Sequence, residues 1–142
     1  RVGFAVGNTD AVAAVTKLKS YIDYGTFQPI QIASTVALNE LDDYPFELSA
    51  VYKERRDLVV EHLEDLDFNV QESDATMFVW AKLPDKFKKD SLKFSLDILE
   101  KSNVAVSPGV GFGKFGEGYI RIALVENKQR IRQAMKNIKA AL

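Results

Sequence analysis

Apolar residues recur along the chain at two spacings, which separate the expected helices from the expected strands. Where they lie three or four positions apart, they predict helices over residues 11–24, 29–41, 46–66, 90–102 and 126–142. Short runs rich in β-branched and aromatic residues predict strands over residues 1–6, 68–71, 76–83, 104–106 and 119–125. The chain therefore mixes helices with strands.

The order of these elements divides the chain into two parts. From about residue 46 the expected order is helix, strand, strand, helix, strand, strand, helix, and the first two strands are expected to pair. This order suits a small sheet with helices packed on one side. The opening strand and helix are typical of the end of a different sheet. We predict an α/β chain in which residues 42–142 form a small α+β domain, while residues 1–41 belong to a neighbouring domain and to the helix that joins the two.

Several apolar side chains are expected to form the interior of the second part. Phe78 and Trp80 have the residue types of a strand core. On the helix over residues 90–102, helical spacing predicts an inward stripe of Leu92, Leu96 and Leu99. A second stripe lies on the last helix and consists of Ile131, Met135, Ile138 and Leu142.

The polar residues of the long helix over residues 46–66 have simple structural interpretations. The cluster E-R-R-D at 54–57 is expected to be a solvated face, as most charge clusters on helices are. His62, on the same helix, is expected to pack against neighbours or to lie on the surface. Neither feature predicts a functional site.

Composition and charge exclude several classes of function. Lys and Arg number 19, Asp and Glu number 20, and the formal net charge is −1, so the sequence carries no electrostatic footprint for nucleic acid or an anionic membrane. The absence of cysteine excludes disulfides, thiol catalysis and cysteine-ligated metals, and the single histidine excludes a multi-histidine metal site. No apolar run approaches the roughly 20 residues of a membrane span. A cytoplasmic protein without a bound metal is the expectation.

The stretch from Ser107 to Asn127 combines a glycine-rich loop with a charged strand. Four glycines within eight positions, at 109, 111, 113 and 116, predict a loop that bends sharply and lets a ligand approach the backbone. Arg121 lies inside the apolar strand that follows. A buried, unpaired guanidinium costs several kcal/mol, so Arg121 needs an anionic partner. The residues alone leave two partners open: a substrate carboxylate, which guanidinium geometry matches, and a structural Asp or Glu elsewhere in the fold.

Four segments of the sequence, taken in order, resemble a known family. They read R-V-G-F-A-V-G-N at 1–8, Y-G-T-F-Q-P-I-Q at 24–31, S-P-G-V-G-F-G at 107–113 and Y-I-R-I-A-L-V-E-N at 119–127. Together they resemble the C-terminal part of class I/II aminotransferases, the pyridoxal 5'-phosphate (PLP) enzymes of fold type I. K-S-Y-I-D-Y-G at 19–25 is similar to the bacterial alanine and LL-diaminopimelate aminotransferase branch. The resemblance covers essentially the whole chain.

The resemblance implies roles for individual residues. Arg121 matches the arginine that grips the substrate α-carboxylate, and Arg1 matches the arginine that contacts the cofactor phosphate. The family's Schiff-base lysine lies eight residues before the position of Arg1, so the resemblance assigns no catalytic residue to this chain. Lys17 and Lys114 match no cofactor position. We therefore expect the isolated chain to be catalytically inert and not to bind PLP.

The resemblance also implies an activity and a division into domains. Residues 1–41 would be the tail of the large cofactor-binding domain with the interdomain helix, and residues 42–142 the small C-terminal domain. The full-length enzyme would be a homodimer that transfers an amino group between an alanine- or aspartate-like amino acid and a 2-oxo acid. Two alternatives are a PLP-dependent carbon–sulfur lyase on the same scaffold, since fold does not settle function, and a cofactor-free α+β module that binds carboxylates.

Overall fold

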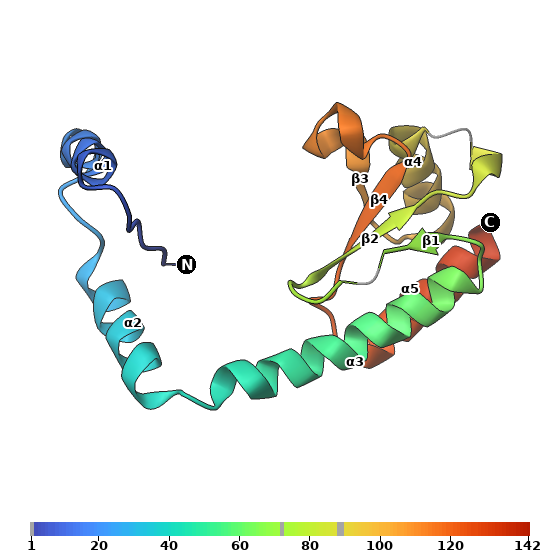
Figure 1. The fold of residues 1–142 in the computed structure, drawn as a ribbon. Helices are drawn as coiled ribbons and strands as arrows, with labels where there is room; N and C mark the ends of the chain where they lie inside the picture. The colour runs from blue at the N-terminus through green and yellow to red at the C-terminus, as the bar shows by residue number, and fades with distance from the viewer. Residues whose placement is uncertain (1, 72, 88–89) are drawn as a thin grey trace. The chain divides into compact units, whose positions relative to one another are not determined.

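The computed structural model describes residues 2–71, 73–87 and 90–142 (Figure 1). The helices in these ranges are α1 (Thr9–Ile22), α2 (Gln28–Glu40), α3 (Tyr44–Glu64), α4 (Ser91–Ser102) and α5 (Lys128–Ala141). The strands are β1 (Asn69–Val70), β2 (Phe78–Lys82), β3 (Ser107–Pro108) and β4 (Tyr119–Ala123). Among the helices of the described residues, none has the length and apolarity needed to cross a membrane. The described part of the chain divides into two compact units, with the boundary between Glu47 and Leu48, inside α3.

The first unit contains α1 and α2, and neither helix buries a side chain. Both begin where the sequence provides a start signal. The Asn8 side chain accepts two backbone N–H groups of the first turn of α1, and Pro29 occupies the first turn of α2. Residues 2–6 form no strand, which corrects the strand predicted over residues 1–6. A strand requires a hydrogen-bonded neighbour, and residues 2–6 have none within the described part of the chain.

The second unit is built on a four-stranded antiparallel sheet in the order β1-β2-β4-β3. Because side chains alternate along a strand, β2 and β4 present one face to the core, and that face carries Val79, Ala81 and Ile120. Helices α3, α4 and α5 complete the same core with Val59, Leu63, Phe94, Ile98, Ile131, Met135 and Ile138. The predicted α/β chain with a small sheet and helices packed on one side is confirmed.

The face of helix α4 that packs against the core is not the face predicted from its leucines. The leucine stripe is exposed and consists of Leu92, Leu96 and Leu99. The buried face instead carries Ser91, Phe94, Ser95, Ile98 and Ser102. The hydroxyl groups of Ser95 and Ser102 donate to backbone carbonyls one turn earlier, at 2.8 and 2.6 Å, so these groups are buried with their hydrogen bonds made. Small side chains of this kind let α4 approach the sheet, which leucine spacing alone does not reveal.

In β2, the two aromatic residues lie on the face opposite the core. Phe78 and Trp80, predicted to be core residues, are only half-buried, whereas Val79 and Ala81 are fully buried. Every one of these four residues is apolar, so composition does not tell which face of the strand meets the helices. The prediction that Phe78 and Trp80 lie in the core is therefore wrong.

Strand β3 forms at Ser107–Pro108 rather than over residues 104–106, because Ser107 and Pro108 are the residues that pair with β4. It is an edge strand, a position that tolerates a proline because no inward N–H is needed. On α5, the predicted stripe is confirmed at Ile131, Met135 and Ile138, whereas Leu142, beyond the end of the helix, is exposed.

The solvated face predicted over residues 54–57 is correct for Glu54 and Asp57, which are exposed, but not for the two arginines, which bind backbone carbonyls. Arg55 Nη1 donates to the Leu124 carbonyl at 2.9 Å, and Arg56 Nη1 donates to the Ser73 carbonyl at 2.7 Å. Both side chains are half-buried. Charge-assisted hydrogen bonds of this kind tie α3 to the segment that leads into β2 and to the residue that follows β4.

Candidate functional site

Arg121 lies in the middle of β4, on the sheet face opposite the hydrophobic core. In the antiparallel register it stands opposite Trp80 of β2 and Ser107 of β3. Phe78 lies on the same face of β2, diagonally across from Arg121, because it pairs with Ala123 two residues further along β4. Strand alternation therefore brings one cation and two aromatic side chains together on this face.

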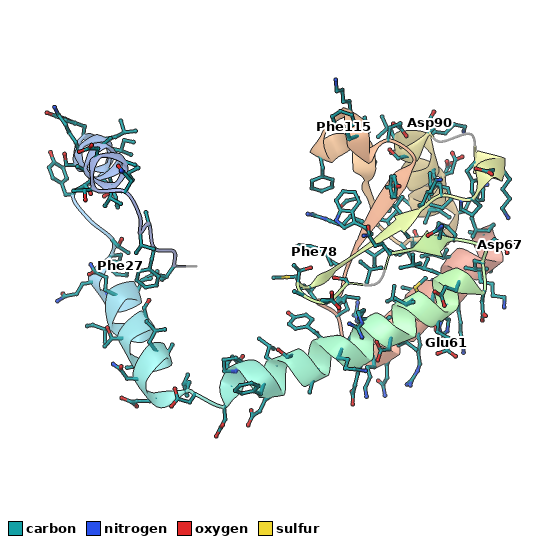
Figure 2. All side chains as sticks on the ribbon, viewed as in Figure 1. Phe27, Glu61, Asp67, Phe78, Asp90 and Phe115 are labelled. Carbon is teal, nitrogen blue, oxygen red and sulfur yellow. The ribbon has the colours of Figure 1, made fainter. Side chains whose placement is uncertain are left out.

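The Arg121 guanidinium lies between two aromatic rings. Its Cζ atom is 4.0 Å from the ring centroid of Phe78, on β2 (Figure 2), and 4.0 Å from the ring centroid of Phe112. The Phe112 ring also meets Trp80 edge to face, with ring centroids 5.3 Å apart and an interplanar angle of 74°. Both arginine–ring distances are within the range in which the face of an aromatic ring attracts a cation. The two rings therefore stabilise the positive charge in place.

Within the described residues, Arg121 pairs with no carboxylate. The ion pairs found there use other cations, such as Lys53 with Asp57 and Lys128 with Glu54. A half-buried guanidinium that lacks an acidic partner has donors available for a bidentate carboxylate. Of the two partners that the sequence leaves open for Arg121, the geometry favours a carboxylate from outside this part of the chain.

The glycine-rich loop carries Phe112 to this face of the sheet. It folds as two short 3-10 helices, η2 (Gly109–Phe112) and η3 (Lys114–Gly116), with Gly113 between them at φ 115°, a conformation that favours glycine. A Cβ atom added to Gly109 would overlap the Gly116 carbonyl oxygen and lie 2.6 Å from the Tyr119 carbonyl oxygen. The sequence predicts that these glycines let a ligand approach the backbone. At Gly109 and Gly116 the close neighbour is instead another part of the loop's own backbone.

Glu117 anchors the same loop to the N-terminus of α4. Its Oε1 atom accepts hydrogen bonds from the backbone N–H groups of Ser91 and Gly118, both at 2.7 Å. In return, the Ser91 hydroxyl oxygen accepts the backbone N–H of Val110 at 3.2 Å. The bond from the Ser91 N–H, followed by the one from Gly118, lowers the pKa of Glu117, because both bonds favour the charged carboxylate.

Glu117→Gln is expected to flatten the pH dependence of stability on the acid side. Because the pKa of Glu117 is lowered in the folded state, its charged form stabilises the fold above the ordinary glutamate pKa of about 4.3. This contribution is lost as the pH falls through the lowered pKa. Urea titrations between about pH 3 and pH 6 should therefore give an unfolding free energy that falls less steeply toward acid in the variant. Glu100→Gln, at an exposed position of α4, is the control. If Glu100→Gln flattened the pH dependence of stability as much as Glu117→Gln does, the role of Glu117 would be contradicted.

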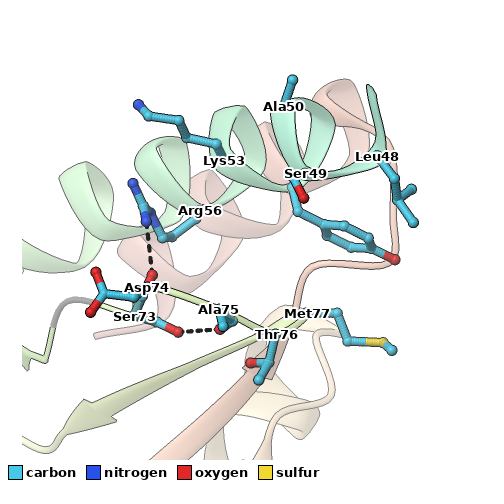
Figure 3. A pocket seen from close by; sticks show the side chains of 11 residues that line it. Leu48, Ser49, Ala50, Lys53, Arg56, Ser73, Asp74, Ala75, Thr76 and Met77 are labelled. Carbon is cyan, nitrogen blue, oxygen red and sulfur yellow. Dashed lines mark hydrogen bonds between the residues drawn. The ribbon is translucent and has the colours of Figure 1, made fainter. Parts of the chain in front are cut away.

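A cavity of about 480 Å³ lies between α3 and the segment that leads into β2 (Figure 3). Two cations line it, but both have protein partners. Lys53 pairs with Asp57 at 2.8 Å, and Arg56 donates to the Ser73 carbonyl. Because these charges are already used inside the protein, we place the candidate site at Arg121 rather than in this cavity.

Sequence reasoning missed the two aromatic partners of Arg121. The signal for Phe78 was present, since antiparallel pairing of the strands containing Phe78 and Arg121 puts alternate residues on a common face. Phe112 gave a weaker signal, because it is one apolar residue among glycines and its contact depends on the path of the loop. Neither contact follows from the residue types alone.

Comparison with known proteins decides the family. The sequence profile of the family "Aminotransferase class I and II" matches residues 1–138. The chain belongs to this family. The chain is 48% identical over 138 residues to the LL-diaminopimelate aminotransferase of Natranaerobius thermophilus, covering 97% of the chain and 35% of that protein. It is 44% identical over 141 residues to the glutamate-pyruvate aminotransferase AlaC of Escherichia coli K12, covering 99% of the chain and 34% of AlaC.

Solved structures agree with the family assignment. The substrate-bound structure of BacF from Bacillus subtilis matches the chain with a TM-score of 0.87 and 31% identity, over 95% of this chain and 34% of BacF. The expected fold, the C-terminal portion of a fold type I aminotransferase, is confirmed. The chain spans about a third of the length of the relatives it matches.

Enzymes of this family depend on PLP, and the described residues do not form a site that holds it covalently. Arg1, which the resemblance assigns to the cofactor phosphate, lies outside the described residues. The described lysines are exposed, apart from the half-buried Lys82, and none is enclosed as a lysine bound to the cofactor would be. The described residues also contain no group of three or more His, Asp or Glu side chains that could hold a metal ion.

Proposed function

We propose that this chain is the C-terminal part of a PLP-dependent aminotransferase, in which Arg121 binds the α-carboxylate of the substrate. The observation that carries the proposal is the setting of Arg121: half-buried, stacked between Phe78 and Phe112, and without a carboxylate partner in the described ranges. The family match supports the reaction class. Amino acids and 2-oxo acids both carry the α-carboxylate that such a guanidinium recognises.

Arg121 orients the substrate in this proposal. A bidentate carboxylate fixes both the position and the plane of the α-carboxylate group, and the bonds of Cα are then directed by the remaining contacts of the active site. PLP, when bound, supplies the electron sink that makes the amino group and the α-proton labile. Because the amino acid and the 2-oxo acid share the carboxylate, Arg121 serves both halves of the amino-group exchange.

We also propose how the chain divides in the full-length protein. Residues 1–41 would be the tail of the large cofactor-binding domain with the interdomain helix, Arg1 contacting the cofactor phosphate, and residues 42–142 the small domain. The first unit supports this division because its apolar side chains have no core of their own. Phe4, Tyr24 and Phe27 are all strongly exposed there. A larger domain and the second subunit of a homodimer would cover such residues.

For the substrates, we propose alanine and 2-oxoglutarate first, and aspartate or LL-diaminopimelate next. The name of AlaC, a glutamate-pyruvate aminotransferase, supports the first pair. The Natranaerobius relative, an LL-diaminopimelate aminotransferase, supports the last. The side chains that distinguish these substrates lie outside the contacts described for Arg121, so the ranking rests on similarity.

The proposal is tested with the full-length protein, PLP, alanine and 2-oxoglutarate. We expect pyruvate and glutamate to form in equal amounts, and only when both substrates are present. Pyruvate and ammonia released from cysteine without any 2-oxo acid would identify a carbon–sulfur lyase instead. The 142-residue chain alone is the negative control, because the resemblance places the cofactor lysine before Arg1. Absence of amino-group transfer with alanine, aspartate and LL-diaminopimelate would overturn the proposal.

A further inference from the structure

We propose that Phe112 is a positioning residue for Arg121: with Phe78, it forms an aromatic clamp that presets the guanidinium for the substrate carboxylate. This inference rests on the proposed function of Arg121. The clamp is defined here as the rings of Phe78 and Phe112, each centred 4.0 Å from Arg121 Cζ.

The clamp restricts the orientation of the guanidinium without using its donors. Aromatic rings attract a cation through their faces and do not compete for in-plane N–H groups as a carboxylate does. A salt bridge would hold Arg121 in place but would occupy the donors that the substrate needs. Two rings fix the group while its N–H edge stays available, so less side-chain freedom is lost when the carboxylate binds.

Phe112 is placed for this contact rather than for burial. Its side chain is 50% exposed, so it contributes little to the hydrophobic core. It nevertheless has two defined neighbours, since its ring faces Arg121 and lies edge to face with Trp80 at 5.3 Å. Ring pairs of this geometry favour one orientation over others.

The glycine-rich loop sets the position of Phe112. The close approach of Gly109 and Gly116 closes the loop on itself, and the Ser91 hydroxyl holds the Val110 N–H at 3.2 Å. Phe112 follows Val110 by two residues. The loop therefore acts on the substrate site indirectly, through the ring that it delivers to the guanidinium.

The same loop provides a matched control. Phe115, labelled in Figure 2, lies three residues after Phe112 and is 88% exposed. It contacts Lys114, with Nζ 5.0 Å from its ring centroid, instead of Arg121. Phe115→Leu makes the same chemical change in the same loop without touching the clamp. Phe112→Tyr keeps a ring at the clamp position and serves as the conservative variant.

The experiment measures steady-state kinetics of full-length Phe112→Leu, Phe112→Tyr and Phe115→Leu, with alanine and 2-oxoglutarate. We expect Phe112→Leu to raise KM for both substrates roughly five- to twentyfold and to change kcat by less than about twofold, because the carboxylate contact is present in ground and transition states alike. The inhibition constant of propionate, a carboxylate without an amino group, should rise by the same factor. Phe112→Tyr and Phe115→Leu should stay within about twofold of the unmodified enzyme.

Three results would overturn the clamp. Phe112→Leu kinetics equal to those of Phe115→Leu would show that the ring does not act on the substrate. A fall in kcat with unchanged KM would place its effect on another step. Equal damage from Phe112→Tyr would show that the aromatic face is not what matters. The Arg121→Ala variant tests the proposed function separately. If Arg121→Ala lost activity while Phe112→Leu kept normal kinetics, Arg121 would remain the carboxylate-binding residue and only the clamp would be rejected.

Discussion

Arg121→Ala should lower kcat/KM for the amino-acid substrate of the full-length enzyme by roughly a hundredfold or more, with KM raised. Removing one partner of a close charge pair costs about 3 kcal/mol, because the other charge is left without its partner. Here the substrate carboxylate would lose both hydrogen bonds of the guanidinium fork. The kinetics should be measured in both directions of the reaction, since the 2-oxo acid loses the same contact.

Two further variants define what Arg121 contributes. Arg121→Lys keeps the positive charge but loses the planar fork and the stacking on Phe78 and Phe112, so its kcat/KM should lie between those of Arg121→Ala and the unmodified enzyme. Arg132→Ala, at an exposed position of α5, controls for loss of an arginine elsewhere and should leave kcat/KM unchanged. If Arg121→Ala retained kcat/KM within about threefold, a role in carboxylate binding would be excluded.

Gly109→Ala should destabilise the second unit by about 3 kcal/mol or more. The added methyl group would overlap the Gly116 carbonyl oxygen and crowd the Tyr119 carbonyl oxygen at 2.6 Å, and both neighbours are backbone atoms that cannot rotate away. A domain is stable by only about 5–15 kcal/mol, so a loss of this size is large. Urea unfolding monitored by far-UV circular dichroism would measure it.

Gly111→Ala is the matched control for Gly109→Ala. A Cβ atom at Gly111 meets no heavy atom within 4 Å, in the same short helix η2. Its unfolding free energy should stay within about 0.5 kcal/mol of the unmodified chain, or rise slightly because alanine restricts the unfolded state. Equal stability of the Gly109 and Gly111 variants would mean that the loop does not close at Gly109 and Gly116 as described.

The sequence predicted which segments are helices and strands better than how they face one another. Helix starts carry local signals, such as the Asn127 side chain that accepts the Arg130 N–H at 3.0 Å at the start of α5. The rotation of a helix about its own axis depends on what it packs against. In α4 two stripes compete. The buried one carries Phe94 and Ile98, and its serines can be buried with them because Ser95 and Ser102 bond to carbonyls of their own helix.

The candidate site was predictable only in part for a related reason. Arg121 stands out in the sequence because a charge inside an apolar strand requires an explanation. The rings that contact it do not stand out, because Phe78 and Phe112 belong to segments separated by more than thirty residues. Their meeting depends on the register between β2 and β4 and on the path of the glycine-rich loop. These are properties of the fold rather than of any local pattern.

The edge-to-face contact of Trp80 with Phe112 gives the site an optical consequence. Trp80 is the single tryptophan of the chain, and it stands opposite Arg121 on the same face of the sheet. All indole emission from this chain therefore originates beside the guanidinium. Tryptophan fluorescence of the 142-residue chain reports the environment of the Arg121 face directly, without a dye or an introduced label.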